Sequence, residues 1–286
     1  MKLVNYFQLL FTSALWGSSF LMIKFSLEEL SPFDIAMYRI LLPAIVLNLL
    51  YRKKVKVSKS DYKYFFILGI IYMALPFFLF ALAEETITSA LAGLINGSTP
   101  IFVALVAIIF YKEKVTTTQK ILITSGFLGI IILSFGGQKA LYGSTEGILY
   151  ALGASICYGV SINMIQPLLK KYTPMGALKI LLLSASFISI ALLGPFSTWA
   201  IPSYSISLYP IIILGLGSSG FAFLTFYQLV DDVGAVPSSV TVNVIPIFSI
   251  IFGYLFLDEI TTLIQMVGVA IVVVSAFFFT RIKSST

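Results

Sequence analysis

Three asparagines, Asn96, Asn163 and Asn243, stand inside long uncharged stretches of the sequence. In a membrane core, such an amide either hydrogen-bonds a neighbouring helix or lines a cavity where it can bind a solute. We expect Asn96 and Asn243 to line a cavity, because each lies shortly before a proline, which frees a backbone carbonyl group. Asn163 is a third candidate for substrate binding, and packing between helices remains the alternative for all three.

The prolines that follow these asparagines, Pro100 and Pro246, are each followed thirteen positions later by a glutamate, Glu113 or Glu259. A carboxylate at a helix C-terminus opposes the helix dipole, so we expect a compensating contact there. We interpret the prolines as hinges and the glutamates as gating or structural residues that contact the neighbouring half of the chain. We do not interpret the glutamates as buried proton carriers.

Three aromatic residues, Trp16, Tyr158 and Tyr227, lie well inside uncharged stretches, away from the interfaces where such rings usually anchor a helix. Aromatic rings that line a cavity suit an amphipathic organic substrate, through stacking or cation–π contact. We therefore include all three as candidate substrate-binding residues. Packing between helices is an equally good interpretation of Trp16 and a better one of either tyrosine alone.

Arg39 is a charged residue inside an otherwise apolar stretch. It could extend outward to Asp34, Glu28 or Glu29, or it could be a fixed cation that attracts a carboxylate or closes an outer gate. We favour the outward, structural arrangement. By similar reasoning, Lys24 and Glu28 form a surface pair, and the acidic pairs Glu84–Glu85 and Asp231–Asp232 are solvated loop charges.

Enzyme chemistry has little support in this sequence. The chain contains no histidine and a single cysteine, Cys157, which weakens most acid–base and metal readings and excludes a disulfide within one chain. No pair of carboxylates is expected inside the membrane, as an intramembrane protease or lipid-modifying enzyme would require. We expect no cofactor and no metal, and the absence of an ATP-binding loop excludes primary pumping by this chain.

The composition explains where these residues must lie. Of 286 residues, 59% are hydrophobic and 10% are charged, whereas a soluble protein has roughly 25% charged residues. Uncharged runs of about 20 residues predict an all-α integral membrane protein, not a barrel. We expect ten transmembrane helices, at about 5–26, 33–51, 62–83, 87–111, 118–136, 145–169, 175–194, 206–229, 234–257 and 261–280.

The basic residues predict the orientation of these helices. With a cytoplasmic N-terminus, all of the 18 lysines and arginines except Lys24, Arg39 and Lys139 fall on the cytoplasmic side. Both termini are then cytoplasmic. This distribution also accounts for the net charge of +6 without any binding of nucleic acid.

The sequence repeats itself at an offset of 146 residues, the separation of Pro100 from Pro246. The same offset aligns Glu113 with Glu259, and a Thr and a Gln follow each glutamate at matching positions. Two halves, 1–139 and 140–286, therefore hold five helices each, and an odd number means that the second half is inverted in the membrane. Inverted repeats are typical of alternating-access transporters, with the substrate site between the halves.

The pattern resembles the EamA-type branch of the drug/metabolite transporter superfamily over essentially the whole chain. The resemblance rests on Leu15-Trp16-Gly17-Ser18-Ser19-Phe20, on Tyr38-Arg39-Ile40-Leu41-Leu42, and on the Pro-to-Glu segments 100–113 and 246–259. It departs where Cys157-Tyr158-Gly159 replaces Trp-Gly and where Leu122 replaces a glycine. The resemblance implies a carrier of small metabolites, with a cavity bounded by the first, third, fourth, sixth, eighth and ninth helices.

We therefore expect a secondary transporter that moves small organic metabolites, amino acids or related compounds above all, outward by alternating access. The alternatives are a membrane-embedded lipid-handling or lipid-modifying protein and a scaffold that transports nothing. The expected partners are the small-molecule substrate and the lipid bilayer of a bacterial inner membrane. Coupling to a proton or other ion gradient is left open, as is the choice between a monomer and a homodimer.

Overall fold

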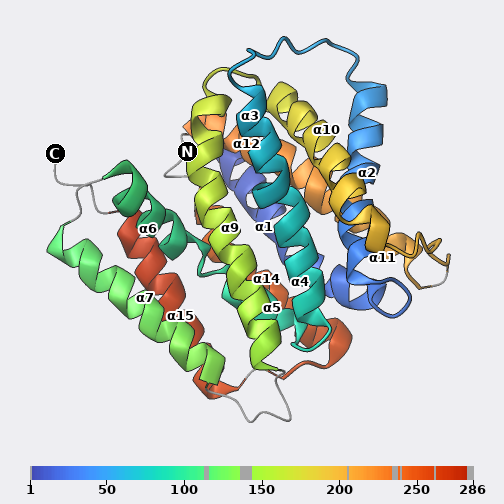
Figure 1. Ribbon diagram of the computed structural model, residues 1–286. Coiled ribbons are helices and arrows are strands. Elements are labelled where there is room, and N and C mark those ends of the chain that lie inside the picture. Colours follow the sequence, from blue (N-terminus) through green and yellow to red (C-terminus); the bar gives the residue numbers. More distant parts are fainter. Residues whose placement is uncertain are drawn as a thin grey trace.

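The computed structural model describes residues 2–112, 116–135, 144–204, 206–233, 238, 240–260 and 262–281. Within these ranges the chain is helical and contains no strand (Figure 1). Seven of the described helices are long and apolar enough to cross a membrane, and two shorter apolar helices lie at 241–257 and 263–275. This agrees with the all-α membrane protein that the composition predicts.

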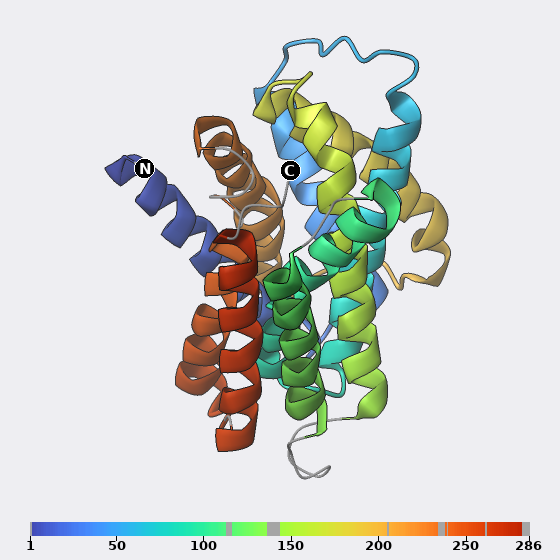
Figure 2. The same ribbon diagram turned by 90° about the vertical axis from the view of Figure 1, so that its left-hand side faces the viewer.

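The first part of the chain forms α1 (Leu3–Ser26), α2 (Pro32–Leu50), α3 (Tyr62–Leu68), η1 (Gly69–Ala74), α4 (Leu75–Glu84), α5 (Ser89–Asn96), α6 (Thr99–Tyr111) and α7 (Thr117–Phe135). The second part forms α9 (Thr145–Leu169), α10 (Pro174–Leu192), η2 (Gly194–Phe196), α11 (Leu208–Ile212), η3 (Ile213–Phe221), α12 (Ala222–Val233), α14 (Val240–Leu257) and α15 (Leu263–Arg281). Figures 1 and 2 show α7 and α15 side by side at one edge of the bundle, away from α2 and α10.

The expected helix over 87–111 is in fact two helices. α5 ends at Asn96, and α6 begins at Thr99 with Pro100 in its first turn. Proline is tolerated there because its missing amide hydrogen leaves no helical hydrogen bond unmade. Pro246, by contrast, lies inside the continuous helix α14. Asn96 therefore lies at a helix end, not in mid-helix as expected.

Two further irregularities occur at matching places in the two halves. π-Helical segments occupy Gly69–Ala74 and Ile213–Phe221, each inside a longer helix. Lys112 and Asp258 both take left-handed backbone conformations, with φ of 54° and 52°. Lys112 and Asp258 are separated by the same 146 residues as the sequence repeat.

The matching Thr and Gln residues of the repeat have the same local role in both halves. Gln119 Oε1 accepts hydrogen bonds from the Thr116 amide at 2.9 Å and the Thr116 hydroxyl at 3.2 Å. Gln265 Oε1 accepts the equivalent bonds from Thr262 at 3.0 and 3.2 Å. Each pair caps the start of a helix, which satisfies amide groups that the helix leaves without partners.

Small residues allow two helix pairs to pack at very short range. A Cβ atom on Gly17 would lie 2.4 Å from Phe248 Cβ, where α1 crosses α14. A Cβ atom on Gly159 would lie 2.6 Å from Phe102 Cβ, where α9 crosses α6. Phe102 and Phe248 are themselves equivalent in the repeat. Close helix packing through glycine is a common device in membranes, where apolar burial alone does not hold helices together.

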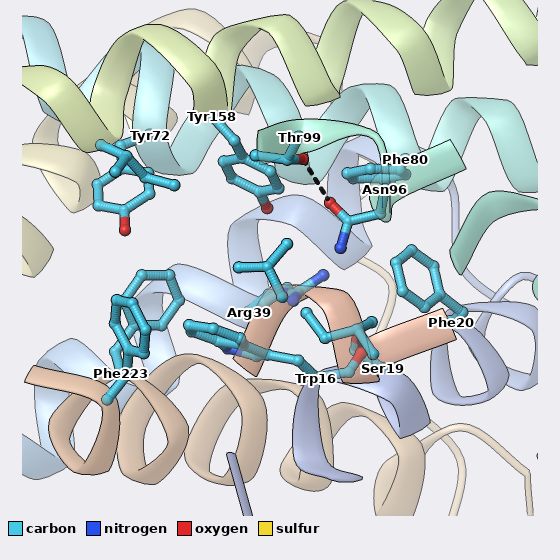
Figure 3. Close-up of a pocket in the computed structure, with 14 residues that line it drawn as sticks. Trp16, Ser19, Phe20, Arg39, Tyr72, Phe80, Asn96, Thr99, Tyr158 and Phe223 are labelled. Atoms are coloured by element: carbon cyan, nitrogen blue, oxygen red, sulfur yellow. Dashed lines mark hydrogen bonds between the residues drawn. The ribbon is translucent and has the colours of Figure 1, made fainter. Parts of the chain in front are cut away.

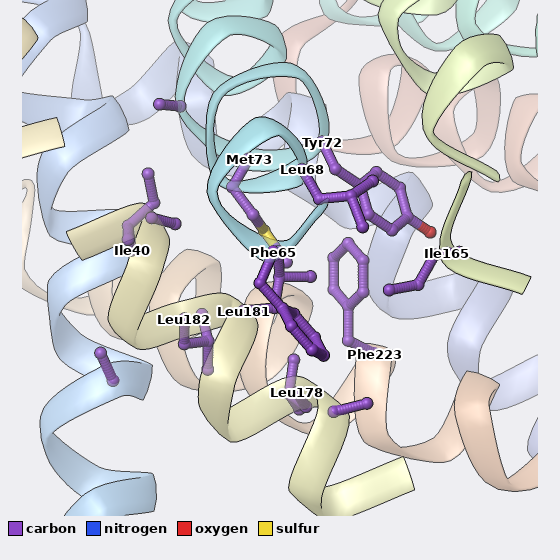
Figure 4. Close-up of a cluster of buried hydrophobic side chains, with 14 of the residues drawn as sticks. Ile40, Phe65, Leu68, Tyr72, Met73, Ile165, Leu178, Leu181, Leu182 and Phe223 are labelled. Atoms are coloured by element: carbon purple, nitrogen blue, oxygen red, sulfur yellow. The ribbon is translucent and has the colours of Figure 1, made fainter. Parts of the chain in front are cut away.

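The interior of the bundle contains a large apolar cluster built by residues far apart in the sequence (Figure 4). It joins Phe65 and Met73 of the α3–η1 segment to Leu181 of α10 and Phe223 of α12. A second cluster packs α1, α4, α5 and α9 together. The central pocket lies where these clusters meet, since Trp16 and Tyr158 pack against both.

Candidate functional site

A central pocket lies between helices of both halves, with about 570 Å³ of space that atoms do not fill, its opening included (Figure 3). Its lining residues are Trp16, Ser19, Phe20, Arg39, Tyr72, Phe80, Asn96, Thr99, Tyr158, Ile162, Phe223, Phe226, Val242 and Ile245. The six spans expected to bound a cavity all contribute, and α2 adds Arg39.

Aromatic rings form much of the pocket wall. Trp16 lies 5.3 Å from Phe223 in an edge-on arrangement and 5.0 Å from Phe226, measured between ring centroids. The Trp16 indole nitrogen donates a hydrogen bond of 3.1 Å to the carbonyl oxygen of Ser218. The indole is thereby fixed in place with its polar group satisfied, and an apolar surface is left for a ligand.

Arg39 is the one charged residue among the described residues of the pocket lining. Only 4% of it is exposed, its Nε donates a hydrogen bond of 3.1 Å to Ser219 Oγ, and its guanidinium carbon lies 3.9 Å from the centre of the Phe77 ring. The hydrogen bond to Ser219 is the only one that the guanidinium makes to a described residue. Figure 3 shows the end of the side chain directed toward the middle of the pocket.

The outward arrangement that we favoured for Arg39 is therefore wrong. Two of the acidic residues it was expected to reach, Asp34 and Glu29, have other partners. Asp34 accepts hydrogen bonds from Thr198 Oγ1 at 2.7 Å and from the Trp199 amide at 3.0 Å. Glu29 accepts bonds from the amide and hydroxyl groups of Ser203, and these contacts lower the pKa of Glu29.

Asn96 is a pocket residue whose amide group is available to a ligand. Its Oδ1 accepts a hydrogen bond of 3.3 Å from Thr99 Oγ1 across the break between α5 and α6. The side-chain nitrogen makes no bond to a described residue, and Figure 3 shows it facing the pocket, across from Arg39. Both groups are hydrogen-bond donors, so this part of the pocket is suited to an acceptor such as a carboxylate.

Three of the predicted substrate-binding residues lie outside the pocket lining. Asn163 Nδ2 donates to the carbonyl oxygens of Val103 at 3.1 Å and Gly159 at 2.9 Å, so it joins α9 to α6. Asn243 is 3% exposed, and neither of its side-chain polar atoms has a partner among the described residues. Tyr227 is buried in the apolar cluster beside Phe223.

The sequence interpretation missed several lining residues, among them Phe20, Tyr72, Phe80 and Phe223. The chain has 25 phenylalanines and 15 tyrosines, so an aromatic residue inside a span carries little information about a cavity. Thr99 was also missed. Its position directly before Pro100 and close to Asn96 is the one local signal that could have identified it.

Of the five residues predicted to act in gating or structure (Arg39, Pro100, Glu113, Pro246 and Glu259), Glu259 makes the clearest contact between the halves. Its carboxylate accepts hydrogen bonds of 2.8 Å from the amides of Ser89 and Ala90 and of 2.9 Å from the Ser89 hydroxyl. These amides begin α5, where a negative charge is favoured by the helix dipole. Glu113 lies outside the described residues.

Two predictions about charged residues near the contact between Glu259 and α5 are wrong. Glu84 is not a solvated loop charge: it is the last residue of α4 and its side chain is fully buried. Lys24 is not paired with Glu28, because its ammonium group donates to the carbonyl oxygens of Glu84 at 2.6 Å and Ile87 at 3.0 Å. The neighbouring Glu85 is exposed, as expected of a loop charge.

In the described part of the chain, no group of three or more Asp, Glu or Cys residues is placed to hold a metal ion. The described residues of the pocket lining likewise contain no carboxylate, and their polar groups include the Arg39 guanidinium, the Asn96 amide and hydroxyl groups. Such a lining can bind and orient a solute.

Comparison with known proteins agrees with this architecture. A transporter of Archaeoglobus fulgidus described as uncharacterized is 27% identical over 273 residues, which cover 94% of this chain and 96% of the relative. The uncharacterized transporter YdfC of Bacillus subtilis is 26% identical over 94% of this chain and 88% of its own length. Human solute carrier family 35 member G1 is 22% identical over 94% of this chain and 76% of its own length.

A solved crystal structure has the same fold, with a TM-score of 0.67 over 96% of this chain and 94% of that chain at 18% identity. The sequence profile of the EamA-like transporter family matches residues 4–135 and 145–281, which together span nearly the whole chain. The resemblance noted in the sequence is thus confirmed, and this chain, a multi-pass integral membrane protein, belongs to the EamA-like transporter family.

Proposed function

We propose that this protein is a secondary transporter that carries small organic metabolites across a membrane by alternating access. The observation that carries the proposal is the central pocket, to which helices of both halves contribute aromatic walls, one buried arginine and one asparagine. A site between two halves is accessible from either side when the halves rock about it. Relatives named as transporters support the same conclusion.

We propose further that the chain is an inverted repeat of two five-helix halves, 1–139 and 140–286. The equivalent helix crossings at Gly17 and Gly159 support this, as do the left-handed residues Lys112 and Asp258. In each pair the two members belong to different halves. Two segments with some identical residues need not repeat these local structures. Descent of the two halves from a common ancestor is therefore the simplest explanation of the repetition.

The contacts at the two ends of the bundle support the proposed orientation. At one end, Lys24 contacts the 84–87 segment and Glu259 contacts Ser89. At the other end, Asp61 pairs with Lys171, and Lys179 donates to the carbonyl oxygen of Tyr51. The second end carries most of the lysines, which would place it in the cytoplasm. We propose a bacterial inner membrane, in keeping with bacterial relatives such as YdfC.

The lining favours a substrate with a carboxylate and an apolar body. In the described residues, the ion pair Lys171–Asp61 is the one within 4.0 Å, so Arg39 has no carboxylate at contact distance. A buried charge without a counterion is costly, and a bound anion would compensate it. Amino acids and related carboxylates meet this requirement, and the aromatic walls favour those with apolar side chains. We propose export of such compounds.

The alternative, a lipid-modifying enzyme, lacks support in the pocket. Among the described residues, its lining contains neither a carboxylate nor a cysteine that could act as a base or nucleophile. Pro100 and Pro246 remain proposed hinges, and the break before Pro100 gives α6 a place to pivot relative to α5.

The proposal can be tested by mass spectrometry of metabolites inside and outside cells that express the protein. Trp16→Ala should abolish the redistribution of the transported compounds, because it removes a pocket wall. Trp199→Ala is a matched control, since Trp199 is half exposed and is not among the residues that line the pocket. A changed lipid or a new covalent product without any redistribution would favour the enzyme instead.

A further inference from the structure

Glu84 is a buried carboxyl group that neither the pocket nor the Glu259 contact accounts for. It is the last residue of α4, and its side chain is 0% exposed. Neither of its two carboxyl oxygens has a hydrogen-bond partner among the described residues. An ionised carboxylate without hydrogen bonds is among the most costly groups to bury, so such residues inside a membrane usually have a function.

The charges around Glu84 do not form a close ion pair with it. Lys24 of α1 and Arg39 of α2 both attract its carboxylate, and Glu259, which follows α14, repels it. The Lys24 ammonium is committed to the backbone carbonyl oxygens of Glu84 and Ile87. Among the described residues, neither Lys24 nor Arg39 lies within 4.0 Å of any carboxylate oxygen.

The remaining elements that pack on α4 add no counterion. On α9, Glu146 is exposed and accepts a hydrogen bond from Tyr150, and Tyr158 lines the pocket. α5 has no titratable side chain, and Tyr72 of η1 lines the pocket. The other titratable residues of α2 are Asp34, which accepts a hydrogen bond from Thr198, and Tyr38, whose hydroxyl donates one to the carbonyl oxygen of Ala200. The charged groups that act on Glu84 are therefore Lys24 and Arg39, which attract its carboxylate, and Glu259, which repels it.

Glu84 also lies next to the contact that closes this end of the bundle. The segment after it leads within five residues to Ser89, whose amide and hydroxyl groups bind Glu259. Separating Glu259 from α5 would expose that segment to water. In the closed arrangement a neutral Glu84 is buried at lower cost than an ionised one and is not repelled by Glu259.

We propose that Glu84 is a proton-binding site, and that it holds its proton while the Glu259–α5 contact is closed and releases it when that contact opens. The ligand of this site is the proton itself. Release leaves the carboxylate ionised, and water that enters with the opening solvates it and accepts the proton. The proton site itself does not depend on the proposed transport function. Its consequence does, because proton release on opening would couple transport to a proton gradient.

Infrared spectroscopy of the purified protein tests whether Glu84 is protonated. At neutral pH, exposed carboxyl groups are ionised, so a carboxylic-acid C=O band would come from a buried acid. We expect this band in the wild-type protein and in Glu85→Gln, its loss in Glu84→Gln, and its retention in Glu84→Asp. A wild-type spectrum at neutral pH that lacks the band, or one that Glu84→Gln leaves unchanged, overturns the proposal.

The link to opening is tested by the reactivity of a cysteine at the closed contact. Ser89→Cys in a Cys157→Ser background retains the two backbone amides that bind Glu259, and residue 89 is buried in the closed arrangement. The rate at which a membrane-impermeant maleimide labels this cysteine is divided by its rate with free glutathione at the same pH, which corrects for thiol ionisation. The corrected rate should be several-fold higher in mildly alkaline than in mildly acidic buffer. Adding Glu84→Gln should leave slow labelling in both buffers, and adding Glu85→Gln should preserve the difference.

If the labelling rate depended on pH equally with and without Glu84→Gln, Glu84 would not control the contact between Glu259 and α5. Both measurements are independent of any transported compound. Failure of the metabolite experiment would thus remove the transport proposal and leave the proton site, whereas failure of the infrared experiment would remove the proton site alone.

Discussion

Arg39 of α2 and Ser219 of η3 are joined by a hydrogen bond of 3.1 Å from the guanidinium Nε to the serine hydroxyl oxygen. The bond links the two halves of the chain at the wall of the central pocket. It occupies one edge of the guanidinium, and the Phe77 ring covers one of its faces. The remaining donor groups can then face a bound carboxylate, in the fork geometry that favours such anions.

Ser219→Ala should therefore weaken substrate binding without preventing transport. A hydrogen bond to a charged group contributes about 1.5 kcal/mol or more, which corresponds to about a tenfold rise in KM. The measurement is the concentration dependence of uptake into proteoliposomes. Ser186→Ala, which removes a hydroxyl bonded within α10, should leave KM unchanged. An unaltered KM for Ser219→Ala would mean that Arg39 needs no such positioning.

Asn96 and Asn163 should respond differently to the same substitution. Asn96→Ala removes an amide that faces the pocket, so we expect lower transport and nearly unchanged stability. Asn163→Ala removes one hydrogen bond from α9 to α6 and one within α9, and it should cost about 0.5–1.5 kcal/mol of stability with transport preserved. Thermal unfolding, followed by a fluorogenic maleimide that reacts with Cys157, measures the stability. If Asn163→Ala lowered transport and Asn96→Ala lowered stability instead, Asn163 would be the pocket residue and Asn96 the structural one.

The crossing of α9 and α6 should depend on the absence of a side chain at Gly159. Gly159→Ala places a Cβ atom 2.6 Å from Phe102 Cβ, and the helices must separate to admit it. We expect a loss of about 1–3 kcal/mol of stability, as in other overpacked interiors. Gly153→Ala in the same helix is the control, because its nearest contact would be an ordinary 3.5 Å. Equal stability of the two variants would argue against a tight crossing.

The pairing of Asp61 with Lys171 and Tyr172, which follow the end of α9, should depend on pH. Hydrogen bonds from Tyr172 and Lys171, together with the charge of Lys171, lower the pKa of Asp61 below its ordinary 3.8. A carboxylate with a lowered folded pKa stabilises the protein fully above its unfolded pKa, and this stabilisation disappears as the pH falls through the folded value.

Asp61→Asn should accordingly lower the melting temperature at neutral pH, and the difference from wild type should vanish in strong acid. Lys171→Gln should have a similar, smaller effect. Lys170→Gln is its matched control, since among the described residues Asp61 pairs with Lys171. A difference between Asp61→Asn and wild type that persists below the folded pKa would show that the contact does not depend on ionisation.

The positions of the long helices could be predicted from the sequence, but which side of each helix faces the pocket could not. Apolar runs and charges locate a span to within a few residues, as for Thr145–Leu169, because lipid imposes the same rule on every span. Whether Asn96 or Asn163 faces a cavity depends on the rotation of a helix against neighbours distant in sequence. The break at residues 97 and 98 fixes this for Asn96.

Arg39 and Glu84 show a second limit. The inward direction of Arg39 follows from the occupation of Asp34 by residues 197–199, more than 150 positions away. The burial of Glu84 follows from the packing of α1, α2 and α9 around α4. Neither fact is encoded in the local pattern of either residue. The two charged residues were thus visible in the sequence, and their surroundings were not.

The most direct test of the account is the flux of a radiolabelled mixture of amino acids through proteoliposomes that contain the wild-type protein, Arg39→Gln or Arg52→Gln. Arg52 lies exposed beyond the end of α2 and is the matched control. We predict uptake by the wild-type protein and Arg52→Gln, competition by phenylacetate but not by phenethylamine, and at least a tenfold loss in Arg39→Gln, about 1.4 kcal/mol. Uptake that is equal in all three proteins, or that phenethylamine alone inhibits, would contradict a pocket that binds carboxylates through Arg39.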